Sequence, residues 1–250
     1  MADVTYDFHD RVVAITGAGT GIGKAAAEGF ARAGATVYLL DVDAAAGNAA
    51  AEDTGTFVSC DITSPEQVDA AFGVIEADHG RLDVLVNNAG GFSVQRTTAE
   101  LPLDEWYRVV DLNLNAVFLT ARRAIPLLRH SDTGRIINLG SMAAQVSNYK
   151  TSPPYVAAKA GAQALTRILA WELAGDGITV NAIAPSVVLT ERILQLRDAE
   201  ERAATARTVP LGRYQSTDEV ASWILYLATE EAGFMTGQTV SVNGGRHMAH

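Results

Sequence analysis

The sequence predicts a doubly wound α/β fold, in which one parallel sheet of seven strands carries helices on both faces. Apolar runs of strand length alternate with longer helical patterns almost to the end of the chain. These runs are rich in Val, Ile, Leu and Thr and do not alternate polar with apolar residues, which is typical of strands covered on both faces. Regular β-α-β alternation winds right-handed and puts helices on both sides of a parallel sheet.

Each element follows from its own stretch of sequence. The expected strands are Val12–Thr16, Thr36–Asp41, Phe57–Cys60, Val84–Asn87, Arg135–Leu139, Thr179–Ala184 and Thr239–Val242. The expected helices cover residues 22–33, 65–78, 104–129, 155–174 and 217–229. Ala44–Ala51 adds a short helix, because alanine is the best helix former. Ser186–Gly212 has little sheet signal and is long for a loop, which favours a lid over a ligand, with helical pieces at Glu191–Leu196 and Ala199–Arg207.

Composition narrows the class of protein. A chain of 250 residues with 48% apolar and 19% charged residues is expected to form one domain, residues 1–250, with a sizeable core. The net charge of −10 argues against nucleic acid or an anionic membrane as a partner. We expect a cytoplasmic location, since the chain has a single cysteine, Cys60, no signal-peptide pattern and no membrane-spanning run.

Two helices carry more apolar surface than one sheet can cover. The stretches 104–129 and 155–174 place apolar residues, Phe118 and Trp171 among them, on more than one face. A helix that is apolar all round is buried, so each needs a second partner. We therefore expect a homo-oligomer, a dimer or a tetramer, built on these two helices.

The glycine-rich turn Thr16–Gly23 joins the first strand to the first helix. Gly17 permits a tight turn, Gly21 lets a pyrophosphate approach the backbone, and Gly23 lets helix and strand pack closely. The helix N-terminus, at Thr20 and Ile22, then offers free N–H groups to phosphate. A purely structural turn is the alternative, but strand, turn and helix in this order predict a Rossmann-like dinucleotide site.

Asp41 ends the second strand, 24 residues after Gly17. A carboxylate there can accept hydrogen bonds from both adenine-ribose hydroxyls and repels a 2′-phosphate. No Lys or Arg follows in Val42-Asp43-Ala44, so the sequence predicts NAD rather than NADP as cofactor. The alternative is that Asp41 only caps the following helix.

Two further strand ends are candidates for cofactor contacts. Asp61 could accept a hydrogen bond from the adenine amino group, with Ile62 supplying its backbone N–H, or Asp61 could simply cap a turn. Asn88, Ala89 and Gly90 are small enough for a ribose to lie against their backbone, the alternative being an Asn-rich turn.

Tyr155 and Lys159 are four residues apart at the start of a helix and therefore share one face. A tyrosine titrates near ~10, and an ammonium one turn away favours the phenolate. The pair could thus supply a general acid–base at neutral pH, although such a spacing is also common by chance.

With these motifs in their order and spacing, the whole chain resembles the short-chain dehydrogenase/reductase family. The resemblance rests on the following segments: Thr16–Gly23, Asn87–Gly90, Ile137–Ser141, Tyr155–Lys159, Thr236–Gln238 and Asn243–Gly245. Two departures stand out. The spacing from Ser141 to Tyr155 is 14, about one residue longer than in the family, and Ser186 replaces the family's glycine after Pro185. We expect Ser186 to adopt a backbone geometry that glycine finds easier.

The resemblance implies a role for each matching residue. Tyr155 would be the general acid–base, and Lys159 would hold the nicotinamide-ribose hydroxyls and tune Tyr155. Ser141 would polarise the substrate oxygen, and Asn113 would hold a water that links Lys159 to solvent. Asparagine is a poor mid-helix residue, which is consistent with a functional role. The residues that match positions facing the nicotinamide are Pro185, Val188 and Thr190.

The sequence therefore predicts an NAD-dependent oxidoreductase that transfers a hydride between the nicotinamide and a secondary alcohol or ketone. One alternative is a 3-oxoacyl thioester reductase, because Val209–Gly245 is similar to the acyl-carrier-protein reductases of the family; Asp41 and the net charge weigh against it. The other is an NAD-binding scaffold without turnover. No metal site is expected from the scattered histidines. The expected substrate walls are Gly91–Arg96, Met142–Pro154 and Ser186–Gly212, with Gly91, Phe92, Met142, Tyr149 and Leu189 suggesting a partly apolar pocket.

Overall fold

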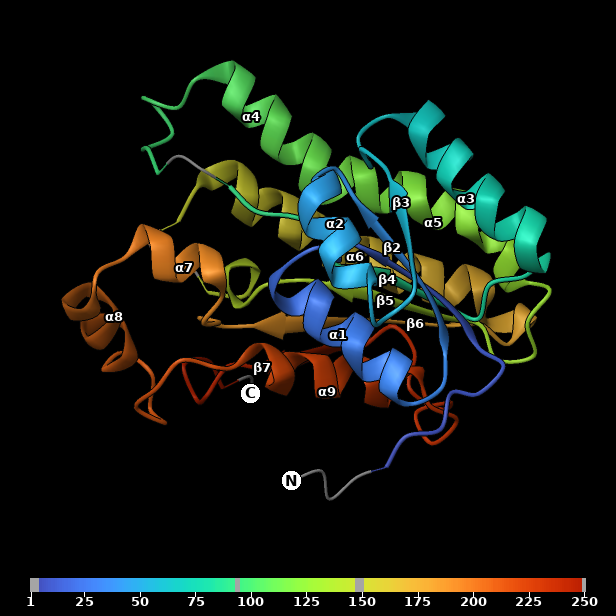
Figure 1. Cartoon of the computed structure of the whole chain (residues 1–250). Helices are drawn as coiled ribbons and strands as arrows, with labels where there is room; N and C mark the ends of the chain where they lie inside the picture. Colours follow the sequence, from blue (N-terminus) through green and yellow to red (C-terminus); the bar gives the residue numbers. More distant parts are fainter. Residues whose placement is uncertain (1–4, 93–94, 147–150, 249–250) are drawn as a thin grey trace.

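One seven-stranded sheet of parallel strands runs through the molecule in the order β3-β2-β1-β4-β5-β6-β7 (Figure 1). The computed structural model describes residues 5–92, 95–146 and 151–248. Its strands are β1 Val12–Thr16, β2 Thr36–Asp41, β3 Thr56–Ser59, β4 Val84–Asn87, β5 Arg135–Leu139, β6 Thr179–Pro185 and β7 Thr239–Val242. The predicted fold class is confirmed, and β3 begins and ends one residue earlier than expected while β6 ends one residue later.

Helices connect the strands, as the alternating pattern predicts. They are α1 Gly21–Arg32, α2 Ala44–Ala51, α3 Pro65–His79, α4 Leu103–Val110, α5 Ala116–Leu128, α6 Pro153–Leu173, α7 Glu191–Leu196, α8 Ala199–Ala206 and α9 Thr217–Ala228. Short 3₁₀ turns, η2 Met142–Ala144 and η3 Ala174–Asp176, follow β5 and α6. None of the helices described is long and apolar enough to cross a membrane.

The expected continuous helix over residues 104–129 is not continuous. A five-residue π-helical segment, η1 Asp111–Asn115, separates α4 from α5. Single π turns inside α-helices occur frequently at functional sites, and here the π segment carries Asn113. The helix is therefore interrupted at Asn113, a residue type that the sequence analysis identified as unfavourable inside a helix.

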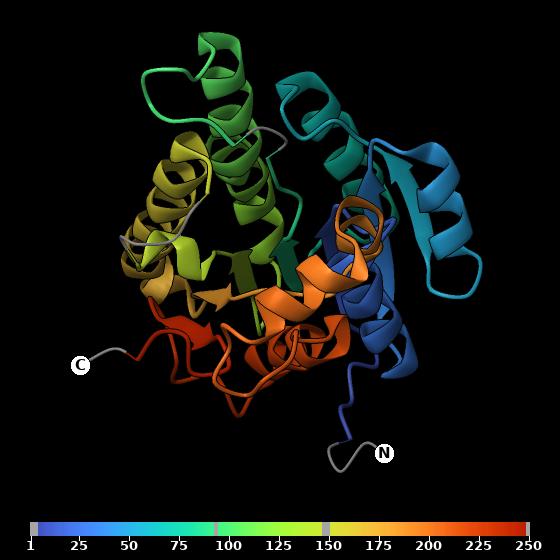
Figure 2. The ribbon, with the colours of Figure 1, turned by 90° about the vertical axis from the view of Figure 1, so that its left-hand side faces the viewer.

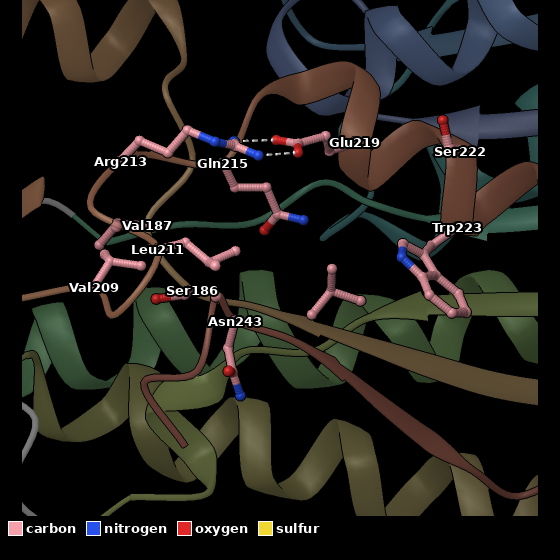
Figure 3. A pocket seen from close by; sticks show the side chains of 12 residues that line it. Ser186, Val187, Val209, Leu211, Arg213, Gln215, Glu219, Ser222, Trp223 and Asn243 are labelled. Carbon is pink, nitrogen blue, oxygen red and sulfur yellow. Dashed lines mark hydrogen bonds and ion pairs between the residues drawn. The ribbon is translucent and has the colours of Figure 1, made fainter. Parts of the chain in front are cut away.

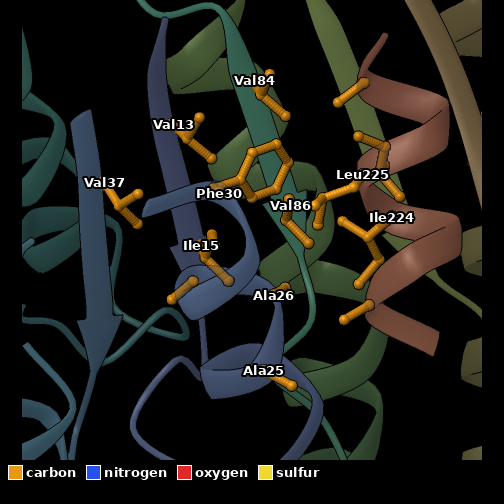
Figure 4. Packing of buried hydrophobic residues seen from close by; sticks show 14 of the residues in the cluster. Val13, Ile15, Ala25, Ala26, Phe30, Val37, Val84, Val86, Ile224 and Leu225 are labelled. Atoms are coloured by element: carbon orange, nitrogen blue, oxygen red, sulfur yellow. The ribbon is translucent and has the colours of Figure 1, made fainter. Parts of the chain in front are cut away.

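Side chains of the same strand enter two different cores. Val13 and Ile15 of β1 pack with Phe30 of α1 and Ile224 of α9 on one face of the sheet (Figure 4). The alternate residues of β1 point to the opposite face, where they meet a second core built with α3, α5 and α6. All five residues of β1 are buried, which explains why the strand reads as a continuous apolar run.

Parallel strands bring their carboxyl ends to one edge of the sheet. The loops after β1, β4, β5 and β6 therefore meet there, and the segment after β6 forms α7 and α8, as its sequence predicts. Figure 2 views the molecule from the side toward which β6 points in Figure 1, and the segment that holds α7 and α8 (orange) lies in front of the sheet. This edge holds the candidate active site.

Candidate active site

A crevice of about 440 Å³ opens at the carboxyl edge of the sheet. It is lined by Gly17, Thr20, Gly21, Ile22, Asp41, Val42, Asn88, Ala89, Gly90, Leu112, Leu139, Gly140, Ser141, Tyr155, Lys159, Pro185, Ser186, Val188, Thr190, Glu191 and Arg192. Residues that are far apart in the sequence thus come together as expected. Three of the predicted site residues are not in this lining, namely Asn113, Asp61 and Ile62.

The glycine-rich turn has the backbone that its glycines make possible. Gly17 and Gly21 have φ values of +62° and +58°, which other residues rarely adopt. A Cβ at Gly23 would lie 2.2 Å from the carbonyl oxygen of Gly17, so only glycine fits between turn and helix. Thr20, the N-cap of α1, makes no side-chain capping bond, so its hydroxyl leaves the N-terminal N–H groups of the helix to a ligand in the crevice.

The loop after β4 is bonded to this turn through two side chains. Thr16 Oγ1 accepts hydrogen bonds from the backbone N–H groups of Asn88 and Ala89, at 3.0 and 3.1 Å. In return, Asn88 Nδ2 donates to the carbonyl oxygens of Thr16 and Gly17, each at 2.9 Å. Asn88 therefore holds the glycine turn in place, a role that the sequence did not reveal. The predicted ribose contact along Asn88–Gly90 stays a prediction.

Asp41 lies at one end of the crevice with both carboxylate oxygens in use. Oδ2 accepts from the Gly19 N–H at 2.9 Å, and Oδ1 accepts from the Asp43 N–H at 3.0 Å. The cap of α2 is Asp43 instead, because its Oδ1 accepts from the N–H groups of Ala45 and Ala46. Among the residues that line the crevice, the basic ones are Lys159 and Arg192, and neither lies in the stretch directly after Asp41, which is Val42-Asp43-Ala44.

Asp61 has the turn-capping role that was the alternative for this residue. Its Oδ1 accepts from the Thr63 N–H at 2.9 Å and from the Thr63 hydroxyl at 2.7 Å. Asp61 and the neighbouring Ile62 lie outside the crevice lining, so an adenine contact by either stays a prediction.

Tyr155 and Lys159 face each other from the first two turns of α6. The Lys159 ammonium is 5.9 Å from the centre of the Tyr155 ring, and its side chain is 3% exposed. Nζ donates to the carbonyl oxygen of Leu139 at 2.5 Å. Burial lowers the pKa of Lys159 to about 8, since desolvation disfavours the charged form. The ammonium is thus held beside the Tyr155 ring at the entrance of α6.

Ser141 lines the same crevice from the loop just after β5. Its Oγ accepts from the Ala143 N–H at 3.1 Å and caps the turn η2, which fixes the orientation of the hydroxyl. Its backbone carbonyl accepts from Gln163 Nε2 at 3.1 Å, which ties the loop to α6. The ring of Phe92 packs against that of Tyr155 with 4.8 Å between centroids, so of the expected apolar walls Phe92 borders the reacting group. Tyr149 lies outside the described residues.

Asn113 lies behind the crevice, where the π segment places it. Its Nδ2 donates to the carbonyl oxygens of Val109 and Gly91, and its Oδ1 accepts from the Gly91 N–H. A Cβ at Gly90 would lie 2.7 Å from Asn113 Oδ1 and 3.1 Å from Lys159 Nζ. Asn113 is thus a neighbour of Lys159 and holds the loop after β4, while the water that the family resemblance implies stays a prediction.

A buried chain of hydrogen bonds lies beneath the crevice, and the sequence analysis missed it. The Thr120 hydroxyl donates to Asn87 Oδ1, Asn87 Nδ2 donates to Asn138 Oδ1, and Asn138 Nδ2 donates to Thr166 Oγ1. The four groups join α5, β4, β5 and α6, and pairing them avoids the cost of burying unpaired amides. The available signal was an asparagine near the end of each of two strands, next to a run of apolar residues.

The expectation for Ser186 was wrong. Within the described part of the chain, Asp10 is the only residue other than glycine with a positive φ, so Ser186 has an ordinary backbone geometry. Its hydroxyl instead accepts a hydrogen bond from Arg246 Nη1 at 3.1 Å, which ties the strand end to the C-terminal segment.

A second cavity of about 300 Å³ lies between the end of the segment 186–212, α9 and β7 (Figure 3). Ser186 borders both cavities. The charged side chains of the second cavity, Arg213 and Glu219, pair with each other at 2.6 Å, and apolar residues such as Trp223 form much of its wall. Among the residues described, no three His, Cys, Asp or Glu side chains are placed to hold a metal ion. The chemistry-bearing groups are therefore in the crevice.

A doubly wound sheet, a glycine turn at a helix N-terminus and an adjacent Ser–Tyr–Lys set define a nucleotide-dependent oxidoreductase. The sequence model of the family described as "Enoyl-(Acyl carrier protein) reductase" matches residues 17–247. The chain belongs to the short-chain dehydrogenase/reductase family, whose members use a nicotinamide cofactor.

Several known proteins are similar over nearly the whole chain. The 3-oxoacyl-(acyl-carrier-protein) reductase of Vibrio cholerae is 36% identical over 241 residues, covering 95% of this chain and 98% of the relative. A 3beta-hydroxysteroid dehydrogenase of Mediterraneibacter gnavus is 36% identical over 264 residues, covering 95% of each protein. The Pseudomonas aeruginosa RhlG/NADP active-site complex superposes with a TM-score of 0.91 at 30% identity, covering 98% of this chain and 99% of that structure.

Gly23→Ala should abolish dinucleotide binding, because the new Cβ would press on the Gly17 carbonyl oxygen at the turn. We expect loss of NADH binding in a fluorescence titration. Gly73→Ala in α3 is the matched control, since no atom lies within 4 Å of its Cβ position, and it should bind NADH normally. Normal NADH binding by Gly23→Ala would contradict the assigned role of the turn.

Lys159→Met should have a higher free energy of unfolding than the parent protein at pH 7, and the difference should shrink at high pH. The folded pKa of about 8 lies below the ordinary value of 10.5, so between these pH values the unfolded chain binds the proton that the folded chain has released. The stability of the parent protein therefore rises with pH across this window, by about 3 kcal/mol. Urea unfolding of both proteins at pH 7 and at pH 10 measures the difference, and a gain that does not shrink with pH would contradict the burial of the charge.

Proposed function

We propose that the protein is an NAD-dependent oxidoreductase that interconverts a secondary alcohol and a ketone, with Tyr155 as the general acid–base. The observation that carries the proposal is the convergence of Ser141, Tyr155 and Lys159 on one crevice whose other end is the N-terminus of α1. The family membership supports an oxidoreductase, and the geometry supports this division of roles.

The crevice fits a dinucleotide. Gly17 and Gly21 remove the side chains that would block a pyrophosphate, and the N-terminus of α1 offers N–H groups to it. When bound, the nicotinamide supplies the hydride acceptor or donor. Pro185, Val188 and Thr190 form the wall on which the nicotinamide would lie.

The chain's own residues handle the proton. In oxidation Tyr155 takes the proton of the substrate hydroxyl, and in reduction it gives one to the carbonyl oxygen. Ser141 Oγ, already oriented by its bond with the Ala143 N–H, donates to the same substrate oxygen. Lys159 holds its charge beside the phenol and uses its remaining N–H groups for the ribose hydroxyls.

Tyr155→Phe should keep NADH binding and reduce turnover by about 10²-fold or more, the scale of a lost acid–base group. NADH titration by fluorescence and the absorbance of the reduced nicotinamide measure the two quantities. Tyr107→Phe removes a hydroxyl from an exposed ring outside the crevice and should leave both unchanged. Parent-rate turnover by Tyr155→Phe would remove Tyr155 from the mechanism and revive the scaffold alternative.

Cofactor choice rests on Asp41. Its carboxylate borders the crevice without a neighbouring cation in the lining, so a 2′-phosphate would meet negative charge there. A solved structure to which the chain is similar holds NADP, so family membership by itself does not imply NAD.

We expect NADH to bind at least about tenfold more tightly than NADPH, since a like-charge contact costs on the order of 1–2 kcal/mol. Asp41→Ser should bring the two affinities closer together, because it weakens the binding of NADH and removes the repulsion of the 2′-phosphate of NADPH. Asp43→Ser is the matched control, because Asp43 caps α2 outside the crevice lining. Tighter binding of NADPH by the parent protein would overturn the assignment.

A 3-oxoacyl thioester reductase is the second candidate, and the similarity to the Vibrio cholerae reductase favours it. Asp41 and a net charge of −10, which would repel an acidic carrier protein, weigh against it. Turnover of a panel of alcohols, sugars, steroids and 3-oxoacyl thioesters with each cofactor separates the two functions.

The partner surface that we propose is the apolar face of α4, α5 and α6. Phe118, Ile168 and Trp171 are 50%, 49% and 83% exposed on these helices. Large exposed apolar side chains on adjacent helices favour self-association into a dimer or tetramer. The net charge of −10 disfavours binding to nucleic acid and leaves a small molecule as the substrate. The single cysteine favours the cytoplasm as the location.

Trp171→Glu should lower the assembly mass measured by light scattering, because it puts a charge in the proposed interface. Phe234→Glu changes a fully exposed side chain in the loop between α9 and β7, which belongs to none of these helices, and should leave the mass unchanged. A parent protein that is only monomeric at micromolar concentration would refute the interface.

A further inference from the structure

The crevice contains one guanidinium that the reaction as described above does not use. Arg192 lies on α7, the first helix of the lid, and lines the crevice together with Tyr155 and Lys159. Lys159 already donates to the Leu139 carbonyl oxygen from a buried position. The positive charge available to a substrate from the lid is therefore that of Arg192.

Arg192 reaches across the crevice to the loop that follows β4. One terminal nitrogen donates to the carbonyl oxygen of Phe92, and the other lies 2.7 Å from the position of a Cβ at Gly91. Gly91 has a φ of +144°, so both its backbone and this close approach require glycine. Since the Phe92 ring packs on Tyr155, the guanidinium is one residue away from the proposed acid–base.

No acid in the described part of the chain forms an ion pair with this guanidinium. Among the described residues, no carboxylate lies within 4.0 Å of the Arg192 nitrogens, whereas ten ion pairs form elsewhere. A guanidinium has five N–H donors in a planar fork that matches a carboxylate, and a single backbone acceptor leaves most of them available. A protein of net charge −10 repels acids on average, so an acidic substrate needs a local cation of this kind.

The position also separates Arg192 from the pyrophosphate end of the crevice. Gly21 borders that end, and its neighbours from the lid are Thr190 and Glu191, whose Oε2 lies 3.9 Å from a Cβ placed at Gly21. The lid thus turns a carboxylate toward the phosphate end and its guanidinium toward Gly91 and Phe92, on the substrate side.

We propose that Arg192 forms a carboxylate-binding subsite, so that the substrates are hydroxy acids and the corresponding oxo acids. The inference rests on the proposed alcohol–ketone chemistry and names its substrate class. The acid oxygens replace the Phe92 carbonyl as partners of the guanidinium, and the reacting carbon then lies toward Tyr155 and Ser141. The lid helix contributes a specificity-determining residue, and Gly91 provides the space that it needs.

The test compares each acid with its own methyl ester. The substrates are 2-, 3- and 4-hydroxy acids and the corresponding oxo acids, assayed with NAD and NADH. The variants are Arg192→Gln, Arg192→Lys and the matched control Arg207→Gln, which removes the same charge from an exposed lid position outside the crevice lining. Calorimetric titration of the hydroxy acids into the protein with NADH, a pair that cannot react, measures the subsite without turnover.

We expect Arg192→Gln to raise KM and Kd for the acids about 10- to 100-fold, the scale of a lost charge-assisted pair, with kcat nearly unchanged. The methyl esters and NADH should bind within about twofold of the parent. Arg192→Lys should recover part of the acid affinity, and Arg207→Gln should change nothing.

Other outcomes overturn the subsite in distinguishable ways. If Arg192→Gln lowers the affinity for acid and ester equally, Arg192 only holds the lid to the Phe92 loop. If the variant binds NADH more weakly, Arg192 contacts the pyrophosphate instead. Acid binding that is absent from the parent protein, or unchanged in Arg192→Gln, refutes the subsite even if neutral alcohols are oxidised. Absence of turnover with every alcohol and ketone refutes the proposed function, while calorimetry still decides the subsite.

Discussion

A lysine ammonium buried beside a phenol is the interaction on which the candidate site depends. Lys159 is almost inaccessible to water, and its closest hydrogen-bond partner is a backbone carbonyl rather than a carboxylate. A carboxylate would have neutralised the charge, whereas the carbonyl of Leu139 orients Nζ and leaves the full charge next to the Tyr155 ring. The cost of desolvating that charge is met by the rest of the fold.

Hydrogen bonds around Lys159 fix the positions of the strands and loops that form the crevice. The Thr120–Asn87–Asn138–Thr166 chain fixes β4 against β5 directly beneath the crevice. Asn113 holds the loop after β4 through the Gly91 N–H, and Asn88 holds the glycine turn through the Gly17 carbonyl oxygen. Because each of these amides is bonded to neighbouring backbone or side chains, the walls of the crevice are set before a ligand arrives.

The segment after β6, which holds α7 and α8, makes fewer buried contacts with the rest of the molecule. Val188 pairs with Gln215 through a single bridge, and the residues of α7 and α8 are largely exposed. Few buried contacts and short helices place such a segment at the low-stability end of a protein. Through its hydrogen bond to the Phe92 carbonyl oxygen, Arg192 joins this segment to the loop beside Tyr155.

The sequence by itself determined the sheet, the order of its elements and most of the crevice. Apolar period, glycine placement and Tyr–Lys spacing are local signals, so the strand bounds agree to within a residue and fourteen predicted site residues line one crevice. Only the tertiary structure decided which amides pair beneath it, that Asp43 rather than Asp41 caps α2, and that the long helix breaks into a π turn at Asn113. The approach of Arg192 to Gly91 was decided in the same way. The α2 cap depends on a choice between two neighbouring carboxylates, and the other features depend on partners more than twenty residues away. A local sequence pattern holds no information on such a choice or on such distant contacts.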